Sequence, residues 1–286
     1  MIDALAPAKI NLFLHVTGKR ADGYHLLESL VAFAAYGDRI SVAPADNLTL
    51  EMSGPFASET DTGPDNLVWK AAEQLRRAAG VRHGAHIHLV KNLPVASGIG
   101  GGSSDAATTL KLLNRAWNLK LAPERLAEIG LSVGADVPVC LLGKPAMMRG
   151  IGEQLEEIPG FELNHIILVN CNIKVSTAEV FRRLPRIEAR PAVRSSDMAG
   201  GVDLAAFLGA TRNDLERPAM EIEPMIADAI AAVSALAGCR LARMSGSGAT
   251  VFGLFATAGA ARDAAVTLTA RHPGWWTRAT RLQGGA

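Results

Sequence analysis

Cysteine is scarce in this chain, and the few cysteines follow no metal-binding or redox spacing. Only Cys140, Cys171 and Cys239 occur among 286 residues, far apart in the sequence. This pattern excludes a disulfide framework and a paired-cysteine zinc site. We expect buried free thiols in a reducing compartment, with one of them near the active site as the less favoured alternative.

An excess of either charge is also absent. Lys and Arg number 29, Asp and Glu number 28, and the formal net charge is +1. No bulk field therefore favours nucleic acid or an anionic membrane as a partner. Arginines such as Arg76, Arg77, Arg182 and Arg183 are interpreted as solvated helix faces.

Long apolar runs and targeting patterns are missing as well. No run approaches the roughly 20 residues that span a bilayer, and the N-terminal residues 1–9 have neither a signal-peptide nor a transit-peptide pattern. We expect a cytoplasmic protein whose partners are small molecules, either a monomer or a weak homodimer.

The length and composition predict two globular domains. The chain is 49% hydrophobic and 20% charged, and its length suits roughly two domains with cores of their own. Glycine and proline cluster over 143–160, so we place the boundary there, with an N-terminal domain at 1–152 and a C-terminal domain at 153–286. Strands and helices alternate without a regular βαβ rhythm, which predicts an α+β fold rather than a doubly wound sheet.

Hydrophobic periodicity and capping residues predict the following elements. In the first half we expect strands at 9–16, 26–34, 38–43, 47–52 and 85–91, and helices at 66–79, 103–117 and 123–134. Asp65 is expected to cap the first of these helices and Gly80 to end it. In the second half we expect strands at 163–170, 240–244, 250–255 and 276–282, helices at 176–184, 203–219, 223–237 and 259–271, and a polar stretch at 185–201.

The most informative segment is the glycine-rich loop within residues 93–107, Leu-Pro-Val-Ala-Ser-Gly-Ile-Gly-Gly-Gly-Ser-Ser-Asp-Ala-Ala. Its four glycines leave backbone amides open to close approach, and the helical run that follows offers unpaired N–H groups and the positive end of its dipole. The loop therefore predicts a phosphate site, and a flexible linker is less favoured. It lacks the Gly-Lys-Ser/Thr ending of a P-loop and the spacing of a dinucleotide fingerprint.

Lys9 and Asp136 are the candidate catalytic residues. The alternation of residues 9–16 predicts a strand with one aliphatic face, and it places Lys9 beside Asn11 on the other face. Asp136 lies in residues 134–140, Gly-Ala-Asp-Val-Pro-Val-Cys, between a helix end and an apolar run that is typical of a strand. An exposed strand lysine and a turn aspartate are the plain alternatives. If the two residues meet, the lysine would steady a carboxylate that orients a substrate hydroxyl and accepts its proton.

Two further patterns are weaker. Residues 245–248, Ser-Gly-Ser-Gly between two apolar strands, form either a hairpin turn or a second loop that closes over the same phosphates. His86 and His88 share a strand face and His83 lies nearby, but no cysteine or carboxylate joins them. A polar outer face is therefore favoured over a metal site.

Three segments, taken in order, resemble the GHMP kinases. They are 7–12 (Pro-Ala-Lys-Ile-Asn-Leu), 94–107 and 244–249 (Met-Ser-Gly-Ser-Gly-Ala). Residues 9–14 followed by 18–25, Gly-Lys-Arg-Ala-Asp-Gly-Tyr-His, are similar to the branch of this superfamily that phosphorylates 4-diphosphocytidyl-2-C-methyl-D-erythritol, and so is Gly-Ala-Asp-Val-Pro at 134–138. The resemblance covers residues 7–255 and is weakest at 185–240.

The resemblance implies a fold and a reaction. The fold would be a two-domain α+β kinase, with an N-terminal ribosomal S5 domain-2-like domain, a C-terminal ferredoxin-like domain and the active site in the cleft. The reaction would be ATP-dependent phosphorylation of the substrate's 2-hydroxyl in the non-mevalonate isoprenoid pathway. Mg²⁺ would accompany ATP, with Ser104 or water alone as its holder, so no metal ligand is assigned.

The resemblance also implies the site residues. The catalytic pair would be Lys9 and Asp136. Tyr24 and Phe181 would sandwich the cytosine, and His25 would hydrogen-bond its edge. The implied ATP-binding residues are Pro94, Val95, Ala96, Ser97, Gly98, Ile99, Gly100, Gly101, Gly102, Ser103 and Ser104 around the phosphates, with Asn66, Lys91 and Asp105 around the adenosine. The implied substrate-binding residues are Asn11, Tyr24, His25, Thr177, Phe181, Gly246, Ser247 and Gly248.

Other interpretations stay open at this point. A kinase for homoserine or a mevalonate derivative would leave Tyr24 and His25 without a base to bind. A non-catalytic sensor would need neither Lys9 nor Asp136. An RNA-binding protein of the S5-like fold conflicts with the near-neutral charge. One departure from the family pattern is Ala96-Ser97, where relatives are richer in glycine; both side chains are small, so we expect the phosphate cradle to form.

Overall fold

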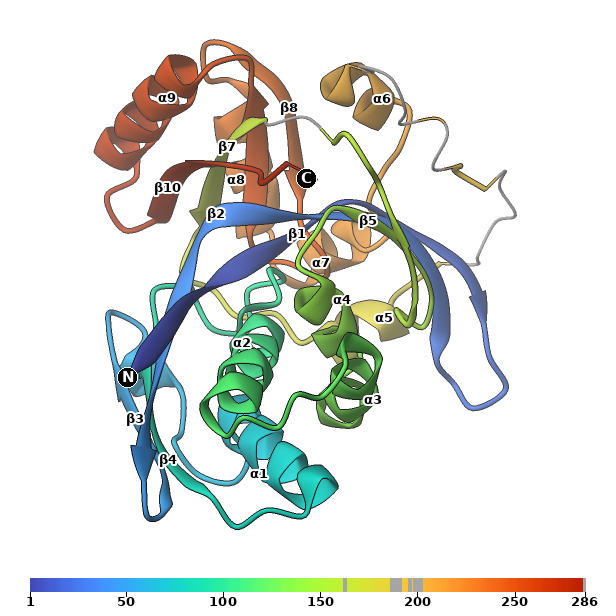
Figure 1. Ribbon diagram of the computed structural model, residues 1–286. Coiled ribbons are helices and arrows are strands. Elements are labelled where there is room, and N and C mark those ends of the chain that lie inside the picture. The colour runs from blue at the N-terminus through green and yellow to red at the C-terminus, as the bar shows by residue number, and fades with distance from the viewer. Residues whose placement is uncertain (162–163, 186–191, 195–196, 198–202, 285–286) are drawn as a thin grey trace. The chain divides into compact units, whose positions relative to one another are not determined.

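The computed structural model describes residues 1–161, 164–185, 192–194, 197 and 203–284 (Figure 1). These residues form two compact units, each discontinuous in sequence. The first unit comprises Met1–Lys9, Tyr36–Val95 and Gly100–Gly143, and the second comprises Ile10–Ala35, Ala96–Ile99 and Lys144–Ala286. Most of the predicted polar stretch at 185–201 lies outside the described residues.

Two long strands, β1 (Ile2–Lys19) and β2 (His25–Ala45), contribute to both units (Figure 1). The predicted strands at 26–34 and 38–43 are one continuous strand, β2. Gly37 makes this continuity feasible, because a Cβ there would lie only 2.0 Å from the carbonyl oxygen of Ala6. Every residue from 8 to 16 is buried, so β1 is covered on its aliphatic face and also on the face that holds Lys9, Asn11, Phe13 and His15.

The first unit combines strands with four helices. β3 (Leu48–Ser53) pairs in parallel with β4 (Gly84–Val90), which pairs antiparallel with residues 39–45 of β2. The helices are α1 (Leu67–Ala79), α2 (Gly101–Ala116), α3 (Pro123–Val133) and α4 (Val137–Leu142), and a 3₁₀ turn, η1 (Ala57–Glu59), precedes them. α2 packs against the other three helices. This unit therefore supplies the helix that follows the glycine-rich loop.

Two predictions about this unit need correction. The cap of α1 is Asn66 and not Asp65, because the Asn66 side chain accepts the N–H of Val68 at 2.8 Å. Residues 137–142 form helix α4 and not a strand. A proline in the first helical turn loses no hydrogen bond, and Gly143 ends the helix with a φ of 66°.

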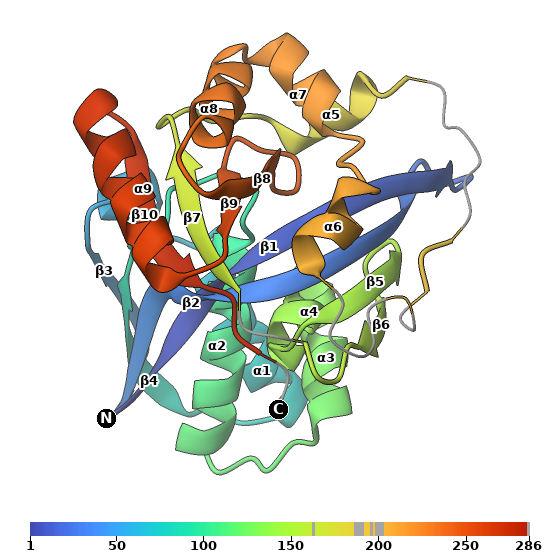
Figure 2. The same cartoon turned by 90° about the horizontal axis from the view of Figure 1, so that it is seen from above.

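The second unit contains a four-stranded antiparallel sheet in the order β10-β7-β9-β8 (Figure 2). Its strands are β7 (His165–Asn170), β8 (Cys239–Met244), β9 (Val251–Phe255) and β10 (Trp276–Arg281). Helices α8 (Met225–Ser234) and α9 (Ala258–Arg271) pack on this sheet. Their apolar residues share one buried core with Ile167 and Val169, which face them from β7.

The remaining elements of the second unit are shorter. β5 (Ala146–Gly150) pairs with residues 27–31 of β2, and with β6 (Gln154–Glu157) it forms a hairpin that the sequence analysis missed. The single helix predicted at 203–219 is two helices, α6 (Leu204–Gly209) and α7 (Glu216–Ile222), and α5 spans Thr177–Arg182. The break has a local cause, since the Asn213 side chain accepts the N–H of Leu215 at 3.0 Å.

Helices and strands are mixed in both units, which confirms the α+β class. Within the described part of the chain, no helix has both the length and the apolar character to cross a membrane. The domain boundary at 152/153 stays a prediction. It divides the chain into two continuous segments, whereas each of the two compact units is built from separate segments.

Candidate active site

Lys9 and Asp136 meet in the first unit. Lys9 Nζ donates a hydrogen bond to Asp136 Oδ2 at 2.8 Å. The side chain of Lys9 is only 4% exposed, whereas that of Asp136 is 38% exposed. Although Asp136 precedes α4, its carboxylate makes no capping hydrogen bond there. The pair thus joins an almost buried ammonium to a carboxylate that a solute can reach, and the alternative of an exposed strand lysine is excluded.

The side chain of Lys9 also contacts the glycine turn that opens α2. A Cβ on Gly100 would lie 3.0 Å from both Cβ and Cε of Lys9. Gly100 is the N-cap of α2 with a φ of 61°, a conformation that glycine adopts without strain. Ser104 N–H donates to the Gly100 carbonyl at 2.9 Å, and Gly100 has no side chain to cap the earlier amides of α2. The first unit therefore places a helix N-terminus with a glycine cap beside the Lys9–Asp136 pair.

Lys91 and Asp105 are brought together, but not at the surface. Lys91 Nζ lies 2.7 Å from Asp105 Oδ2 and 2.5 Å from Asp38 Oδ2. All three residues are almost completely buried. Asn66 is similarly engaged, since its amide caps α1 and donates to the Asp61 carbonyl at 2.7 Å. The adenosine contacts expected of Lys91, Asp105 and Asn66 stay predictions, and these polar groups already have protein partners.

Residues 96–99 of the glycine-rich loop contact the second glycine turn inside the second unit. Ser245 Oγ donates to the Gly98 carbonyl at 3.0 Å, and Thr250 N–H donates to the Ser97 carbonyl at 3.0 Å. A Cβ on Gly98 would lie 2.5 Å from the Ser245 carbonyl oxygen. Residues 245–250 also connect the antiparallel strands β8 and β9. The segment is therefore both a hairpin connection and a second loop packed on the first.

Several predicted substrate residues lie in contact within the second unit. Thr177 and Ser247 share a hydrogen bond between their hydroxyls at 2.8 Å. The backbone N–H of Asn11 donates to Ser245 Oγ at 3.0 Å, and its side-chain amide donates to Ser29 Oγ at 2.8 Å. These contacts link the residues implied by the resemblance on β1, on α5 and in the second glycine turn.

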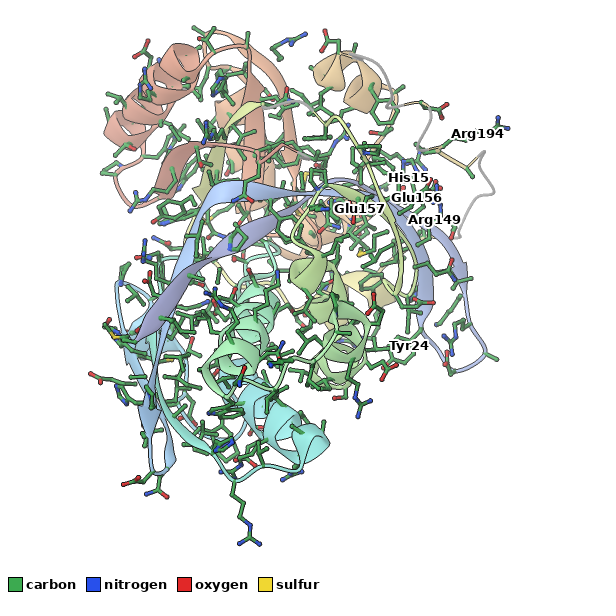
Figure 3. All side chains as sticks on the ribbon, in the orientation of Figure 1. His15, Tyr24, Arg149, Glu156, Glu157 and Arg194 are labelled. Carbon is green, nitrogen blue, oxygen red and sulfur yellow. The ribbon has the colours of Figure 1, made fainter. Side chains whose placement is uncertain are left out.

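The aromatic residues expected around a cytosine are also partly assembled. The ring of His25 stacks on Phe181, with centroids 4.9 Å apart and planes 24° apart. Tyr24, labelled in Figure 3, is 59% exposed. Burial, with a smaller effect of Lys19, lowers the pKa of His25. His25 therefore covers one face of Phe181.

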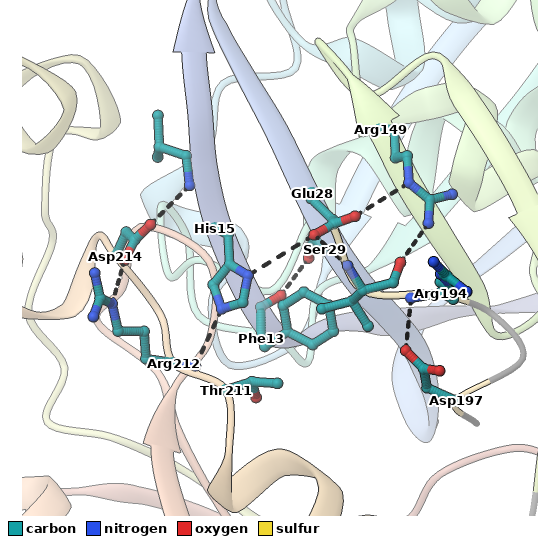
Figure 4. Close-up of polar contacts among 12 residues, drawn as sticks. Phe13, His15, Glu28, Ser29, Arg149, Arg194, Asp197, Thr211, Arg212 and Asp214 are labelled. Atoms are coloured by element: carbon teal, nitrogen blue, oxygen red, sulfur yellow. Dashed lines mark hydrogen bonds and ion pairs between the residues drawn. The ribbon is translucent and has the colours of Figure 1, made fainter. Parts of the chain in front are cut away.

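A buried polar network around His15 was not foreseen. His15 Nδ1 lies 4.0 Å from Glu28 Oε2, and Arg149 Nε lies 3.3 Å from Glu28 Oε1 (Figure 4). Arg149 also pairs with Glu156 at 2.9 Å, and both are labelled in Figure 3. Burial lowers the pKa of His15 despite the nearby carboxylates of Asp214 and Glu28. The network fixes β1 and β2 to β5, which supports the strands that carry Asn11 and His25.

The described residues contain no cluster of three or more His, Cys, Asp or Glu side chains that could hold a metal ion. The three cysteines are free thiols, and Cys239 is only partly buried, contrary to expectation. Cys140, on α4, is buried, and burial raises its pKa to about 12. The thiol therefore stays protonated near neutral pH and supplies no nucleophile.

The chain is similar to known protein families and to named relatives. The family described as "GHMP kinases N terminal domain" matches residues 66–144, and "GHMP kinases C terminal" matches 189–273. Proteins named 4-diphosphocytidyl-2-C-methyl-D-erythritol kinase from Paramagnetospirillum magneticum and Cereibacter sphaeroides are each 51% identical to the chain. The first match covers 97% of both proteins, and the second covers 99% of this chain and 100% of the relative.

Solved structures show the same fold. A crystal structure of 4-(cytidine 5'-diphospho)-2C-methyl-D-erythritol kinase superposes with a TM-score of 0.79 at 34% identity, over 99% of this chain and 100% of that one. A homoserine kinase from Cytophaga hutchinsonii gives 0.73 at 16% identity, over 99% and 94% of the two chains, which shows the fold alone. The two matched domains and this fold define a GHMP kinase. Given half of all residues identical over nearly the full length, the chain belongs to the 4-diphosphocytidyl-2-C-methyl-D-erythritol kinase family.

Proposed function

We propose that this protein transfers the γ-phosphoryl group of ATP to the 2-hydroxyl of 4-diphosphocytidyl-2-C-methyl-D-erythritol, a step of the non-mevalonate isoprenoid pathway. The observation that carries the proposal is the position of Lys9, which contacts Gly100 at the start of α2 and bonds Asp136 at 2.8 Å. A phosphate-binding turn and a carboxylate base are the two parts that phosphoryl transfer to an alcohol requires. Relatives that are named for this activity match nearly the whole chain, which supports the choice of substrate.

The chemistry of the first unit follows from these contacts. Phosphoryl transfer is catalysed mainly by positioning and by stabilisation of charge. The backbone amides at the start of α2 would bind phosphate oxygens. Asp136 would accept the proton of the acceptor hydroxyl as its oxygen bonds to the γ-phosphorus and the bond to the bridging oxygen of ADP breaks. Lys9 would keep the carboxylate aligned and carry positive charge next to the transferring group.

Mg²⁺ fits this site only in part. The ion is usually held by substrate phosphates together with one or two protein oxygens. Ser104 offers a hydroxyl in the first turn of α2, but the residue is 1% exposed, and Asp136 is the accessible carboxylate beside the turn. When bound, Mg²⁺ would neutralise phosphate charge, and its ligands stay unassigned.

The remaining site residues are proposed in the same roles as their counterparts in the family. Residues 94–104 would surround the ATP phosphates, with Asn66, Lys91 and Asp105 near the adenosine. Asn11, Thr177 and residues 246–248 would bind the acceptor, and its cytosine would lie between Tyr24 and Phe181. Stacking on an aromatic ring contributes about 1–3 kcal/mol per base, so these rings would determine much of the preference for a cytidylyl substrate. The free thiols fit a cytoplasmic enzyme.

The test is a substrate comparison with the purified protein. ADP release is followed with Mg-ATP and, separately, 4-diphosphocytidyl-2-C-methyl-D-erythritol, homoserine and mevalonate. We expect turnover with the cytidylyl substrate alone. Turnover with another alcohol would mean that the protein is a GHMP kinase without a cytosine site. ATP binding without turnover on any of the three alcohols would favour a sensor.

A further inference from the structure

Asp38, which has no role in the proposed reaction so far, binds three residues at the start of the glycine-rich loop. Asp38 lies on β2 and is 0% exposed. Its Oδ1 accepts the backbone N–H groups of Asn92 and Leu93 at 2.5 and 2.8 Å. Its Oδ2 accepts Lys91 Nζ at 2.5 Å. One carboxylate therefore holds three consecutive residues, 91–93, immediately before Pro94.

Lys91 extends this contact to the helix on the far side of the loop. Its ammonium donates to Asp105 Oδ2 at 2.7 Å, in the first turns of α2. It also lies against the glycine turn, because a Cβ on Gly101 would be 3.2 Å from Lys91 Nζ and 3.7 Å from Asp38 Oδ2. The chain that enters the loop and the helix that leaves it are thus tied to the same ammonium.

We infer that Asp38 is a positioning residue for phosphate binding: with Lys91 it fixes the entry of the glycine-rich loop relative to the first turns of α2. The inference rests on the proposed function, since it assumes that the phosphates of ATP bind at this turn. Asp38 touches no substrate itself. It acts through the backbone of residues 92–93 and through Lys91.

The charge balance of the cluster allows Asp38 to be tested by substitution. Two carboxylates share one buried ammonium, and a second uncompensated charge in such a place is strongly disfavoured. Burial and the neighbouring Asp38 raise the pKa of Asp105 to about 8, although Lys91 opposes the shift. Removing the charge of Asp38 favours ionisation of Asp105, which then balances Lys91. The variant Asp38→Asn should therefore fold, since its amide oxygen can still accept the N–H groups of Asn92 and Leu93, while its amide nitrogen no longer accepts from Lys91.

The experiment measures the dissociation constants of ATP, ADP and adenosine by calorimetry for the wild type, Asp38→Asn and a control. The control is Asp3→Asn, which removes the exposed partner of Arg39, the neighbour of Asp38. We expect Asp38→Asn to weaken ATP and ADP binding about tenfold, as the loss of one charged interaction would. Adenosine, which lacks phosphates, should change less than about twofold, because Asp105 still binds Lys91 and keeps it at the proposed adenosine site, and the control should match the wild type.

The outcomes separate the inference from the function it rests on. Unchanged ATP binding in Asp38→Asn, or equal weakening of ATP and adenosine, overturns the positioning role alone. A wild type that fails to bind ATP overturns the proposed function and the inference with it. A second measurement needs no variant: hydrogen exchange of the Asn92 and Leu93 amides without ATP should be as slow as in β4, and fast exchange would contradict their fixation by Asp38.

Discussion

Asp136 supplies a charge and a proton acceptor that an amide of the same shape cannot replace. In Asp136→Asn the side chain can still accept a hydrogen bond from Lys9, but it is no longer a base. We expect kcat to fall by about 10²–10⁴-fold, the usual contribution of a general base. The dissociation constant of ATP should stay within about threefold, because the turn at Gly100 is unchanged. ADP release and calorimetry measure the two quantities.

A matched control for this variant is Glu128→Gln. Glu128 is 65% exposed on α3 and pairs with Arg125 in an i,i+3 contact, of a kind that contributes little. It should keep wild-type kcat and ATP affinity. Equal losses of both quantities in Asp136→Asn would show that Asp136 is structural rather than a base.

The catalytic residues could be proposed from the sequence, but their contact could not. Lys9 stood out because a core strand has no need of a solvating charge, and Asp136 because it lies among apolar residues. Their side chains are 127 residues apart in sequence, and only the fold joins them. Asp38 was missed because it is the first residue of the second of two segments predicted as separate strands, and its partners follow 53 to 55 residues later. No local pattern marks such a residue.

The glycine-rich loop offers a comparison that separates backbone strain from packing. Gly98 has a φ of 74°, and a Cβ there would lie 2.5 Å from the Ser245 carbonyl oxygen. Gly80, after α1, has a φ of 65° with open space around it. We expect Gly80→Ala to lower the free energy of unfolding by about 1 kcal/mol, the cost of the left-handed conformation. Gly98→Ala should lower it by about 2–4 kcal/mol, since overpacking adds to that cost.

Urea denaturation of the two variants measures both values. Equal destabilisation would show that the contact between residues 96–99 and the second glycine turn is loose. The sequence predicted the phosphate cradle from its glycines and from the helix that follows. It left open whether residues 245–248 were a hairpin or a second loop, because a glycine turn between strands has the same pattern in both cases.

The arrangement of the whole chain explains which elements were predicted and which were not. Strands and helices with strong periodicity were found close to their observed bounds, and with them the α+β class. β5 and β6 were missed because residues 143–160 are rich in glycine and were interpreted as a domain boundary. Gly150 and Gly152 instead adopt φ values of 71° and 116° in a hairpin turn. Composition describes only a local stretch of the chain. It does not show that β1 and β2 each have residues in both units.

Buried titratable groups give the folded chain a stability that depends on pH. Burial raises the pKa of Asp105 from 3.8 to about 8, so the folded state holds this proton more tightly than the unfolded state does. The resulting stabilisation is complete below pH 3.8 and is lost as the pH rises through 8. His15 acts in the opposite direction. Because burial lowers its pKa below 6.5, its contribution is lost only as the pH falls below that value.

Between pH 6.5 and 8 the effect of Asp105 can therefore be measured apart from that of His15. We expect the free energy of unfolding of the wild type to fall with rising pH, by at most about 1.4 kcal/mol per pH unit. Asp105→Asn should remove this slope, because an amide stays neutral throughout the range. Asp3→Asn, which changes an exposed carboxylate, should retain it. Urea denaturation at half-unit intervals from pH 6.5 to 8 measures the difference. A slope in Asp105→Asn equal to that of the wild type would mean that Asp105 is already ionised at pH 6.5, with Lys91 balancing two carboxylates.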